Sequence, residues 1–575
     1  MRKFSHKFDF CVVGGGMAGL CAAIAAARKG IPTAIIQDRP IFGGNSSSEI
    51  RVHICGADRA GKIPNMRETG ILEELRLENL RRNPQRSFSI WDTILYEKVL
   101  LEPNLEAFLN CSCLDAEMEG DRIRSVTGWQ LTTETYHKIE AEIFADCSGD
   151  GILAPLTGAE FRIGREARSE YGESYAPEVA DRKTMGMTCL FGARDTGKPQ
   201  PFEPPCWAYD FPTDDDLPHR VHGHLEMGYW WIELGGEQDS IHDTEKIRDE
   251  LLKIVFGIWD HLKNHGDHGA ETWVLDWIQF LPGKRESRRY IGDHVLTQND
   301  IESEGRFEDI VAYGGWPMDD HHPGGFWHKG EPTTFYPTPS PYGIPYRCLY
   351  SKNIANLMFA GRCASCSHMA MSSTRVMGTG AVMGQAVGIA TALAVKNGIN
   401  PREVGRQHLK QLQQELLRDD CYLPWLRQEF SPLTRQAVLQ ASSGDPEPLR
   451  DGINRPVGEE LHAWEGKIGE SIEYVFSPPQ RVSTLTLIFD SALSRYIAMS
   501  HLGKYDYPTQ VPLEMVRDFR IQILTSEGWR SWREIKGNYQ RLVRMDVGLV
   551  VSGIRVVFDA TWGAERVRLY AFYLD

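Results

Sequence analysis

A strand, a glycine-rich turn and a helix follow one another in residues 8–29, FDFCVVGGGMAGLCAAIAAARK. Residues 8–13 are apolar enough for a short buried strand, and the alanine-rich residues 20–29 favour a helix. Residues 33–36, TAII, then supply a second strand within about 30 residues of the first. This order is typical of a βαβ unit whose helix N-terminus faces a bound phosphate group.

Each glycine of the turn has a separate task in such a unit. Gly14 permits the tight turn, Gly16 lets a pyrophosphate approach the backbone, and Gly19 lets the helix pack close to the strand. Met17 and Ala18 lie at the start of the helix, where free N–H groups and the positive end of the helix dipole would meet the phosphates. The sequence therefore predicts a dinucleotide site rather than an ordinary turn.

The ribose-binding position departs from the usual pattern. An acidic residue is expected about 20 residues further on, at the end of the second strand. The spacing places Gln37 there, with Asp38 next to it. Gln37 can hydrogen-bond a hydroxyl but carries no charge, and Asp38 can serve if the strand end is shifted by one residue. The contact could lie on either side chain.

Three later segments favour flavin over nicotinamide. A glycine pair, Gly43-Gly44-Asn45, follows the second strand, and residues 143–151, IFADCSGDG, end a strand at a glycine stretch. Residues 356–362, NLMFAGR, and 378–388, GTGAVMGQAVG, place a strand shortly before a helix. Together these segments resemble the FAD proteins of the glutathione-reductase-like superfamily, in which the last helix points its N-terminus at the isoalloxazine ring.

Within that superfamily the chain most resembles the bacterial FAD-dependent oxidoreductase family. This family also holds the flavin part of heterodisulfide reductase A-type proteins and is related to fumarate reductase flavoproteins. The resemblance covers roughly residues 8–415, with signatures in QDRPIFGGN (37–45), GKRESRR (283–289), IPYR (344–347) and AGR (360–362).

The resemblance implies bound FAD. No flavin-linking His or Cys motif is recognisable, so we expect the cofactor to be non-covalent. The expected FAD contacts are Gly14, Gly16, Met17, Ala18, Gly19, Gln37, Asp38, Arg39, Gly43, Gly44, Asn45, Ser46, Arg51, Gly149, Asp150, Gly361, Arg362, Thr379, Gly380, Ala381 and Val382.

Composition fits a cytoplasmic enzyme with a small-molecule substrate. The 575 residues carry a net charge of −15, from 63 basic and 78 acidic side chains, which disfavours nucleic acid or an anionic membrane as a partner. The N-terminus leaves no room for a signal peptide before the first strand, and no apolar run reaches the ~18–20 residues of a membrane span. The electron acceptor is not indicated, and homo-oligomerisation stays open.

The twelve cysteines are scattered, mostly in apolar strand-like contexts, as expected of buried reduced thiols. Cys363 and Cys366 have C-x-x-C spacing directly after a flavin motif. They could form a redox pair, or they could be two small residues beside the flavin, which is the reading we favour. The cysteine runs of iron–sulfur proteins are absent from the sequence.

The fold class expected is α/β, with several domains. An FAD-binding Rossmann-like βαβ domain takes residues 1–154 and 351–420, and an inserted α+β substrate domain takes 155–350. The insert holds eight of the fifteen tryptophans and one long helix, at about 243–264. A linker at 421–450 leads to an all-β, sandwich-like domain at 451–575.

Apolar residues alternate with polar ones in that last segment, as in half-buried strands. Three runs show the pattern: Phe519, Ile521 and Ile523; Ile554, Val556 and Phe558; Val567, Leu569 and Ala571. The arrangement loosely resembles a galactose-binding-like or discoidin-like sandwich. We favour a packing or oligomerisation role over sugar binding, because no motif there fixes a ligand.

Two segments are candidates for the catalytic groups. The loop at 316–325, WPMDDHHPGG, presents Asp319, His321 and His322 between turn residues, so a carboxylate-oriented imidazole could act as a general base. The alternative is a solvated loop. No metal site is expected, since neighbouring histidines rarely reach one ion.

The second segment is residues 367–375, SHMAMSSTR. It lies between the two halves of the last flavin motif. A neutral His368 could accept a hydroxyl proton, and Arg375 could hold an oxyanion or a carboxylate.

Arginines of the 283–289 segment are candidates for substrate binding. Arg285 and Arg288, with Trp316 from the loop, could bind a carboxylate or stack on a ring, or the arginines could belong to a salt-bridged strand. We expect an FAD-dependent oxidoreductase that oxidises a CH–OH group of a small polar molecule, for example a sugar. Alternatives are fumarate-reductase-like reduction of an activated alkene carboxylate, a flavin-bearing tRNA-modifying protein, and a carbohydrate-binding protein.

Overall fold

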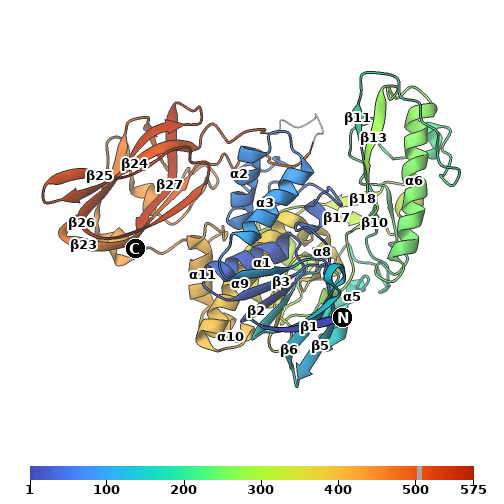
Figure 1. Ribbon diagram of the computed structural model, residues 1–575, viewed down its shortest axis with the longest axis horizontal. Helices are drawn as coiled ribbons and strands as arrows, with labels where there is room; N and C mark the ends of the chain where they lie inside the picture. The colour runs from blue at the N-terminus through green and yellow to red at the C-terminus, as the bar shows by residue number, and fades with distance from the viewer. Residues whose placement is uncertain (501–507) are drawn as a thin grey trace.

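A computed structural model describes residues 1–500 and 508–575. Figure 1 shows a central α/β domain, a curled all-β lobe formed by the C-terminal segment, and a third lobe that carries the long helix α6 (Thr244–Asn264). We call the third lobe the cap. The expected α/β class is confirmed.

A five-stranded parallel sheet forms the centre of the α/β domain. Its order is β20-β8-β2-β3-β4, with β2 (Phe10–Val13), β3 (Thr33–Ile36), β4 (Leu105–Phe108), β8 (Ile143–Asp146) and β20 (Leu357–Phe359). All residues of β2, β3 and β8 are buried, as expected for strands covered on both faces. The alternation of apolar and polar residues in 104–147 predicts a small antiparallel sheet inserted before β8, and β4 lies in this stretch. It pairs with β3 instead, because its exposed Glu106 is tolerated at a sheet edge.

Two helices pack closely beside this sheet. α1 (Met17–Arg28) and α9 (Met377–Asn397) touch through small residues: a Cβ on Gly384 would lie 2.0 Å from the Ala18 carbonyl oxygen. α9 is long and apolar enough to cross a membrane, but 94% of its most apolar window is buried inside the protein. Its apolar composition therefore fits a core helix.

A four-stranded sheet covers one side, in the order β1-β7-β6-β5. β5 (Cys111–Glu119), β6 (Arg122–Gln130) and β7 (Thr135–Glu140) are antiparallel, as expected. β1 (Arg2–Lys7) joins β7 in parallel; its polar, exposed residues gave no strand pattern. The other helices of this domain are α2 (Ile71–Arg82), α3 (Phe88–Leu100), α4 (Leu153–Thr157), α5 (Arg168–Tyr171), α7 (Gln298–Glu302), α8 (His368–Thr374), α10 (Pro401–Gln407) and α11 (Leu409–Arg418).

The cap has its own hydrophobic core, which lies between α6 and two paired strands, β11 (Phe191–Asp195) and β13 (Trp273–Ile278). α6 confirms the predicted long helix. Residues from about 296 onward belong instead to the core of the central domain. Short strands connect the two parts: β9 (Phe161–Arg162), β10 (Met187–Thr188), β12 (Glu233–Leu234), β14 (Gly283–Lys284), β15 (Arg289–Tyr290), β16 (Ile310–Gly314), β17 (Met318–His321), β18 (Thr333–Tyr336) and β19 (Tyr342–Pro345).

The C-terminal domain is a seven-stranded antiparallel sheet in the order β22-β27-β23-β26-β24-β25, with β21 beside β23. All three predicted alternating runs lie on its strands with their apolar residues inward. Short helix α12 precedes it. The bounds are α12 (Pro432–Gln436), β21 (Val438–Ala441), β22 (Trp464–Lys467), β23 (Ser471–Phe489), β24 (Val516–Thr525), β25 (Gly528–Ile535), β26 (Leu542–Thr561) and β27 (Arg566–Leu574).

This domain packs firmly on the central one. Leu77 and Leu80 of α2 belong to the same hydrophobic cluster as the β-strands. Arg541, fully buried, pairs with Asp420 at 2.7 Å between Nε and Oδ2. Breaking such a buried pair leaves an uncompensated charge, so the interface is specific. These contacts agree with the favoured packing role.

Candidate functional site

A cavity of about 380 Å³ opens where the parallel strands end. Because β2, β3, β8 and β20 run in the same direction, the segments that follow them meet at one edge of the sheet. Fifteen of the expected FAD contacts line this cavity: Gly14, Gly16, Met17, Ala18, Gln37, Asp38, Arg39, Gly43, Gly44, Asn45, Gly149, Asp150, Gly361, Arg362 and Gly380.

The glycine turn has the geometry expected from its spacing. Gly14 has φ +104°, and a Cβ there would lie 2.5 Å from backbone atoms of Cys147. A Cβ on Gly19 would lie 1.9 Å from the Gly14 carbonyl oxygen, so Gly19 serves close packing. A Cβ on Gly16 would meet only Gly44 Cα, at 3.9 Å, and would project into the open cavity. Gly16 is therefore the glycine whose hydrogen leaves room for a ligand.

The geometry favours Asp38 over Gln37 for the ribose position. Gln37 is buried: its Oε1 accepts from the Gly15 N–H at 2.7 Å and its Nε2 donates to the Ile41 carbonyl. Gln37 thus braces the glycine turn. The Asp38 side chain is 61% exposed and lines the cavity, and its Oδ1 lies 3.8 Å from Arg39 Nε, so its carboxylate can still accept from a hydroxyl.

Asp150, a partly buried carboxylate, also lines the cavity. Asp150 pairs with Lys284 at 2.7 Å and with Arg362 at 3.2 Å. Burial alone would raise the pKa of Asp150, but the two cations and the Ser287 hydroxyl lower it to about 2. Lys284 was not among the expected site residues, although it lies in the GKRESRR segment. Its backbone carbonyl also accepts from Asn45 Nδ2.

Six expected FAD contacts lie outside the cavity lining, namely Gly19, Ser46, Arg51, Thr379, Ala381 and Val382. Ser46 accepts from Trp91 Nε1 and donates to the Gly43 carbonyl, which holds the loop. The Arg51 guanidinium lies 4.4 Å from the Trp277 ring. The remaining four serve helix packing: Gly19 against the Gly14 carbonyl, and Thr379, Ala381 and Val382 as buried residues of α9.

Arg375 links the cavity to a buried charge network. Arg375 lines the cavity, and its Nη2 donates to Asp319 Oδ2 at 3.1 Å. Asp319 Oδ1 lies 3.3 Å from His321 Nε2, and His321 Nδ1 lies 2.6 Å from Glu233 Oε2. Glu233 in turn contacts Arg285 at 3.4 Å. β17 supplies Asp319 and His321, β12 supplies Glu233, and Arg375 and Arg285 directly follow α8 and β14.

Burial would destabilise these charges singly, but the network keeps the carboxylates ionised. Burial raises the pKa of Asp319, yet His321 and Arg375 bring it below its ordinary value. Burial likewise raises the pKa of Glu233, and Arg285 with His321 more than offsets this. An ionised Glu233 can only accept a hydrogen bond, so His321 Nδ1 is the donor.

His368 is placed differently from the expectation. It is buried at the N-terminus of α8, with Nδ1 2.9 Å from Glu286 and Nε2 3.1 Å from Asp320. Burial lowers the pKa of His368, but the two carboxylates raise it to about 10. At neutral pH both ring nitrogens are protonated, so His368 has no lone pair with which to accept a proton. It is an ion-pair centre and not the neutral base that we expected.

His322 and Trp316, the other two candidates of the loop, lie outside the charge network. His322 follows β17 on the surface, where its ring stacks on His328 at 3.5 Å between centroids and its Nδ1 accepts from the Gly324 N–H. It points away from the network, because neighbouring residues of a strand face opposite sides. Trp316 is half-buried, and its indole N–H is enclosed without an acceptor.

The arginine segment divides into separate roles. Arg285 belongs to the Glu233 network and also donates to Thr188 and to the Trp230 carbonyl. Arg288 donates to the Asp150 carbonyl and lies over the Phe161 ring, so it supports the wall of the cavity. Arg285 therefore stays a candidate for substrate binding, whereas the contacts of Arg288 support the cavity wall.

Comparison with known families agrees with the motifs and the cavity. Residues 9–416 match the family described as "FAD dependent oxidoreductase", which is well over half of the chain. The chain belongs to this FAD-dependent oxidoreductase family. The enzyme class expected from the sequence is thereby confirmed, and a flavin cofactor follows from it.

Solved structures show distant likenesses to this FAD-dependent oxidoreductase. A geranylgeranyl bacteriochlorophyll reductase-like protein from Thermoplasma acidophilum is 12% identical, covers 72% of this chain and 86% of its own, and has a TM-score of 0.33. FrdA of the E. coli quinol fumarate reductase is 12% identical over 72% of this chain and 75% of its own, with a TM-score of 0.29. A family 32 carbohydrate-binding module from Streptococcus pneumoniae EndoD is 14% identical over 25% of this chain and 99% of its own, with a TM-score of 0.20.

The residues of the cavity fit FAD. Gly16 leaves the space that a pyrophosphate needs, and Asp38 offers a carboxylate for a ribose. At the far end Arg362 Nη1 and Arg375 Nε are buried polar atoms without a hydrogen-bond partner. Since buried donors are normally paired, these atoms point to oxygen- or nitrogen-bearing groups of a ligand.

Cys363 and Cys366 behave as packing residues. Their thiols donate to backbone carbonyls, of Asp146 and Ala360 for Cys363 and of Ala364 for Cys366. Both are buried and reduced, and burial raises the pKa of each thiol, that of Cys366 to about 12. Such thiols are poor nucleophiles, which agrees with the favoured reading of small residues beside the flavin.

Proposed function

We propose that this FAD-dependent oxidoreductase oxidises a CH–OH group of a small polar molecule, with a sugar or sugar derivative as the leading class. The observation that carries the proposal is the position of Arg375. It lines the cofactor cavity and hydrogen-bonds the carboxylate of the Asp319–His321–Glu233 network. Arg375, which can bind a substrate oxygen, is thus linked through Asp319 to His321, which can exchange a proton.

His321 replaces His368 as the proposed base. Its Nδ1–H donates to Glu233, which fixes the ring, and its Nε2 faces Asp319. The Nε2 contact, at 3.3 Å, is longer than the Nδ1 contact, at 2.6 Å. The proposed step requires that a substrate hydroxyl displaces Asp319 from Nε2 and meets a ring that is unprotonated there; the hydroxyl proton then passes to Nε2, and Glu233 balances the charge of the imidazolium.

Arg375 is proposed to hold the substrate oxygen. One nitrogen is anchored on Asp319, while Nε is buried without a partner. A guanidinium held in this way offers a preorganised donor to the oxygen on which negative charge develops as the proton leaves. Bound FAD would supply the two-electron step by accepting a hydride from the carbon that bears this oxygen.

An aromatic side chain beside His321 supports a sugar-like substrate. Trp230 is 40% exposed, and its ring meets the His321 ring edge to face at 5.5 Å between centroids. Indole faces suit the C–H face of a sugar ring. Phe191, Tyr229 and Trp231 nearby are buried in the cap core instead, so Trp230 is the side chain of this group that can meet a ligand.

Non-covalent FAD is part of the proposal. Cys111, Cys113 and Cys147 are the thiols that line the cavity. Burial raises the pKa of Cys111 to about 11 and that of Cys113 to about 12, and it also raises the pKa of Cys147. Thiols held in the neutral form are weak nucleophiles towards a flavin.

A second candidate reaction is reduction of an activated alkene that carries a carboxylate. Arg375 Nε and Trp316 Nε1 are both buried donors without acceptors, and Arg285 lies in the same network. Such a set of donors could bind a carboxylate. The direction of electron flow separates the two reactions. Under anaerobic conditions an alcohol substrate bleaches the oxidised flavin, whereas an unsaturated dicarboxylate re-oxidises enzyme that has first been reduced with dithionite.

The net charge and the domain contacts bear on the two remaining alternatives, a tRNA-modifying protein and a carbohydrate-binding protein. A net charge of −15 disfavours tRNA as a substrate, and salt-dependent RNA binding would contradict this view. The C-terminal domain is proposed to stabilise the central domain, through α2 and the Arg541–Asp420 pair. The electron acceptor can be sought by supplying oxygen, a quinone analogue or a carrier protein to the substrate-reduced enzyme.

A further inference from the structure

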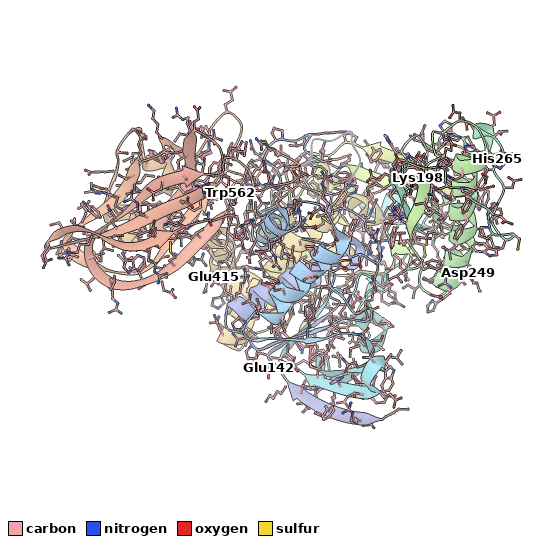
Figure 2. All side chains as sticks on the ribbon, turned by 45° about the horizontal axis from the view of Figure 1, so that its top comes forward. Glu142, Lys198, Asp249, His265, Glu415 and Trp562 are labelled. Atoms are coloured by element: carbon pink, nitrogen blue, oxygen red, sulfur yellow. The ribbon has the colours of Figure 1, made fainter. Side chains whose placement is uncertain are left out.

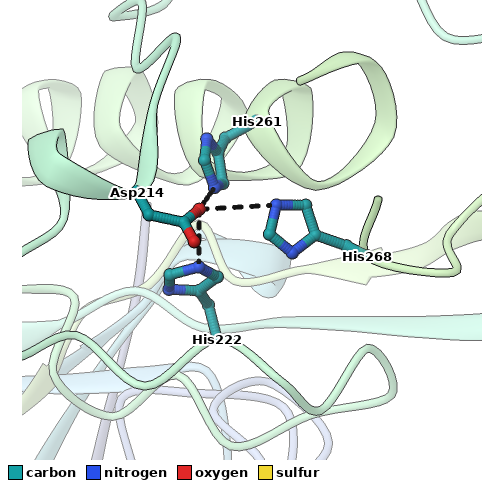
Figure 3. A group of neighbouring side chains, drawn as sticks. All are labelled: Asp214, His222, His261 and His268. Carbon is teal, nitrogen blue, oxygen red and sulfur yellow. Dashed lines mark ion pairs between the residues drawn. The ribbon is translucent and has the colours of Figure 1, made fainter. Parts of the chain in front are cut away.

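Four side chains from separate parts of the cap converge on one point. They are Asp214, His222, His261 and His268, and their potential ligand atoms all lie within 4.8 Å of one another. Figure 3 shows the three imidazole rings directed at the Asp214 carboxylate from three sides. His261 lies on α6, and the other three lie on the segments before and after that helix.

The distances suit four ligands around one small ion. Asp214 Oδ1 lies 3.1 Å from His261 Nε2, 3.5 Å from His222 Nε2 and 3.7 Å from His268 Nε2. A tetrahedral site with bonds of about 2.0–2.1 Å has edges of about 3.4 Å between its ligand atoms. The three distances from Asp214 are close to this value, and the remaining ligand atoms lie within 4.8 Å of one another.

Backbone contacts hold two of the imidazoles in the form that a metal needs. His261 Nδ1 lies 2.7 Å from the Phe211 carbonyl oxygen, and His222 Nδ1 lies 2.6 Å from that of Arg220. A carbonyl can only accept, so Nδ1 carries a proton in both rings and Nε2 is the nitrogen left to bind a metal. Outer hydrogen bonds of this kind orient the histidine ligands of metal sites.

An independent observation also points to a ligand. Nε2 of His261 and Nε2 of His268 are buried polar atoms without a hydrogen-bond partner, and His261 is 1% exposed. Buried polar atoms are normally paired, so these two nitrogens point to a ligand that lies between them and Asp214.

We propose that Asp214, His222, His261 and His268 bind one Zn²⁺ ion per chain. Three imidazoles and one carboxylate in a four-coordinate arrangement match zinc, while octahedral oxygen-preferring ions such as Mg²⁺ or Ca²⁺ do not suit this set. The candidate site is empty in this structure. Since the protein supplies all four ligands, no position remains for a substrate, and the ion has a structural role.

The position of the site agrees with that role. Thr244, at the start of α6, lines the FAD cavity, and His261 lies 17 residues further along the helix, or about 26 Å away at 1.5 Å per residue. Figure 2 shows His265, one turn beyond His261, at the outer end of the cap. The ion would join the segments at 214–222 and 268 to this end of α6 and so stabilise the cap.

A neighbouring group does not share these features. Asp210, Asp260 and His265 also lie close together, but Asp260 Oδ1 accepts from Asn264 and none of the three has a buried atom without a partner among the described residues. His265 directly follows the last residue of the same helix, four positions after His261. It therefore provides a matched control.

The experiment measures metal content and its effect on the intact holoenzyme. Wild type and His265→Ala, purified with FAD bound, should contain about one zinc per chain by mass spectrometry of the metals. His261→Ala and His268→Ala should hold at least about tenfold less. Chelation should lower the Tm of wild type, and Zn²⁺ should restore it, whereas the Tm of the two ligand variants should not respond. His222→Gln, on a surface segment, repeats the test if a helix variant fails to fold.

Cobalt provides a second readout that is independent of activity. Co²⁺ added to the zinc-depleted protein should give the visible absorption of a four-coordinate site, at wavelengths beyond the flavin band, in wild type and His265→Ala and not in His261→Ala. The proposal is overturned if metal-depleted wild type takes up neither Zn²⁺ nor Co²⁺. Equal zinc content in wild type and in the His261→Ala and His268→Ala variants would also overturn it. FAD content is measured in parallel, so a failure here is distinguishable from a failure of the proposed oxidation.

Discussion

Arg375 is bound twice to Asp319: its Nη2 donates to the backbone carbonyl and to Oδ2, each at 3.1 Å. The first contact depends on the path of β17 and the second on the charge of the carboxylate. Arg375 is thereby fixed at the cavity wall with Nε still without a partner. The proposed chemistry depends on this fixed cation, and so do the first predictions.

Replacing Arg375 by Lys should slow flavin reduction by about 10²–10³-fold, the usual cost of losing one preorganised donor. Lysine keeps the charge but cannot hold Asp319 and a substrate oxygen in one plane. FAD content should stay near normal, because the cofactor cavity has many other contacts. Stopped-flow reduction at matched FAD occupancy measures the effect, and an unchanged rate would remove Arg375 from the reaction.

His321 and His322 form a natural pair for comparison. His321→Ala should reduce the rate of flavin reduction by about 10²–10⁴-fold, as expected for a general base. His322→Ala should leave the rate within a factor of about two, because that ring stacks on His328 at the surface. If both variants keep full activity, the β17 network is structural and the base lies elsewhere.

Gly16 separates FAD binding from folding. Its φ of −67° is open to any residue, so Gly16→Val adds no backbone strain, but the new side chain would occupy the space of the pyrophosphate. We expect the variant to be purified folded and colourless, while Gly16→Ala keeps part of its FAD. Absorbance of the purified proteins measures this, with circular dichroism as the folding control. A yellow Gly16→Val protein would contradict the proposed cofactor position.

His368 should make stability depend on pH. Its folded pKa of about 10 lies above the ordinary value of 6.5, so its contribution is fully present below pH 6.5 and is lost as the pH rises towards 10. Over this window the free energy of unfolding should fall by up to about 1.4 kcal/mol per pH unit from this group. His368→Gln should flatten the slope, as measured by denaturant unfolding between pH 6.5 and 10. An equal slope in both proteins would show that His368 is not held as an imidazolium.

Local patterns predicted the parts of the fold that are built from neighbours in the chain. The turn at Gly14 to Gly19, the helix at 244–264 and the inward runs on β24, β26 and β27 all follow from short-range spacing. The edge strand β1 was missed because its exposed, polar residues show no alternation, and the short edge strand β4 was assigned to the antiparallel insert instead of the parallel sheet. Edge strands need fewer buried residues, so they leave a weaker pattern.

The charge of the site could not be predicted from the chain order. His368 was expected to be neutral, and the residues that stabilise its protonated form, Glu286 and Asp320, lie 82 and 48 positions away. Glu233, which contacts His321, lies 88 positions from it, and the proposed metal ligands of the cap are spread over residues 214–268. Pairings of this kind arise only when strands and loops pack together.

The most direct test is anaerobic mixing of the purified holoenzyme with a panel of sugars, polyols and carboxylates while the flavin absorbance near ~450 nm is followed. The account predicts that a sugar or polyol bleaches the flavin of wild type and of His322→Ala at similar rates, and that of Arg375→Lys at least about 10²-fold more slowly. The contradicting result is that no alcohol bleaches the flavin while an unsaturated carboxylate rapidly re-oxidises the dithionite-reduced enzyme.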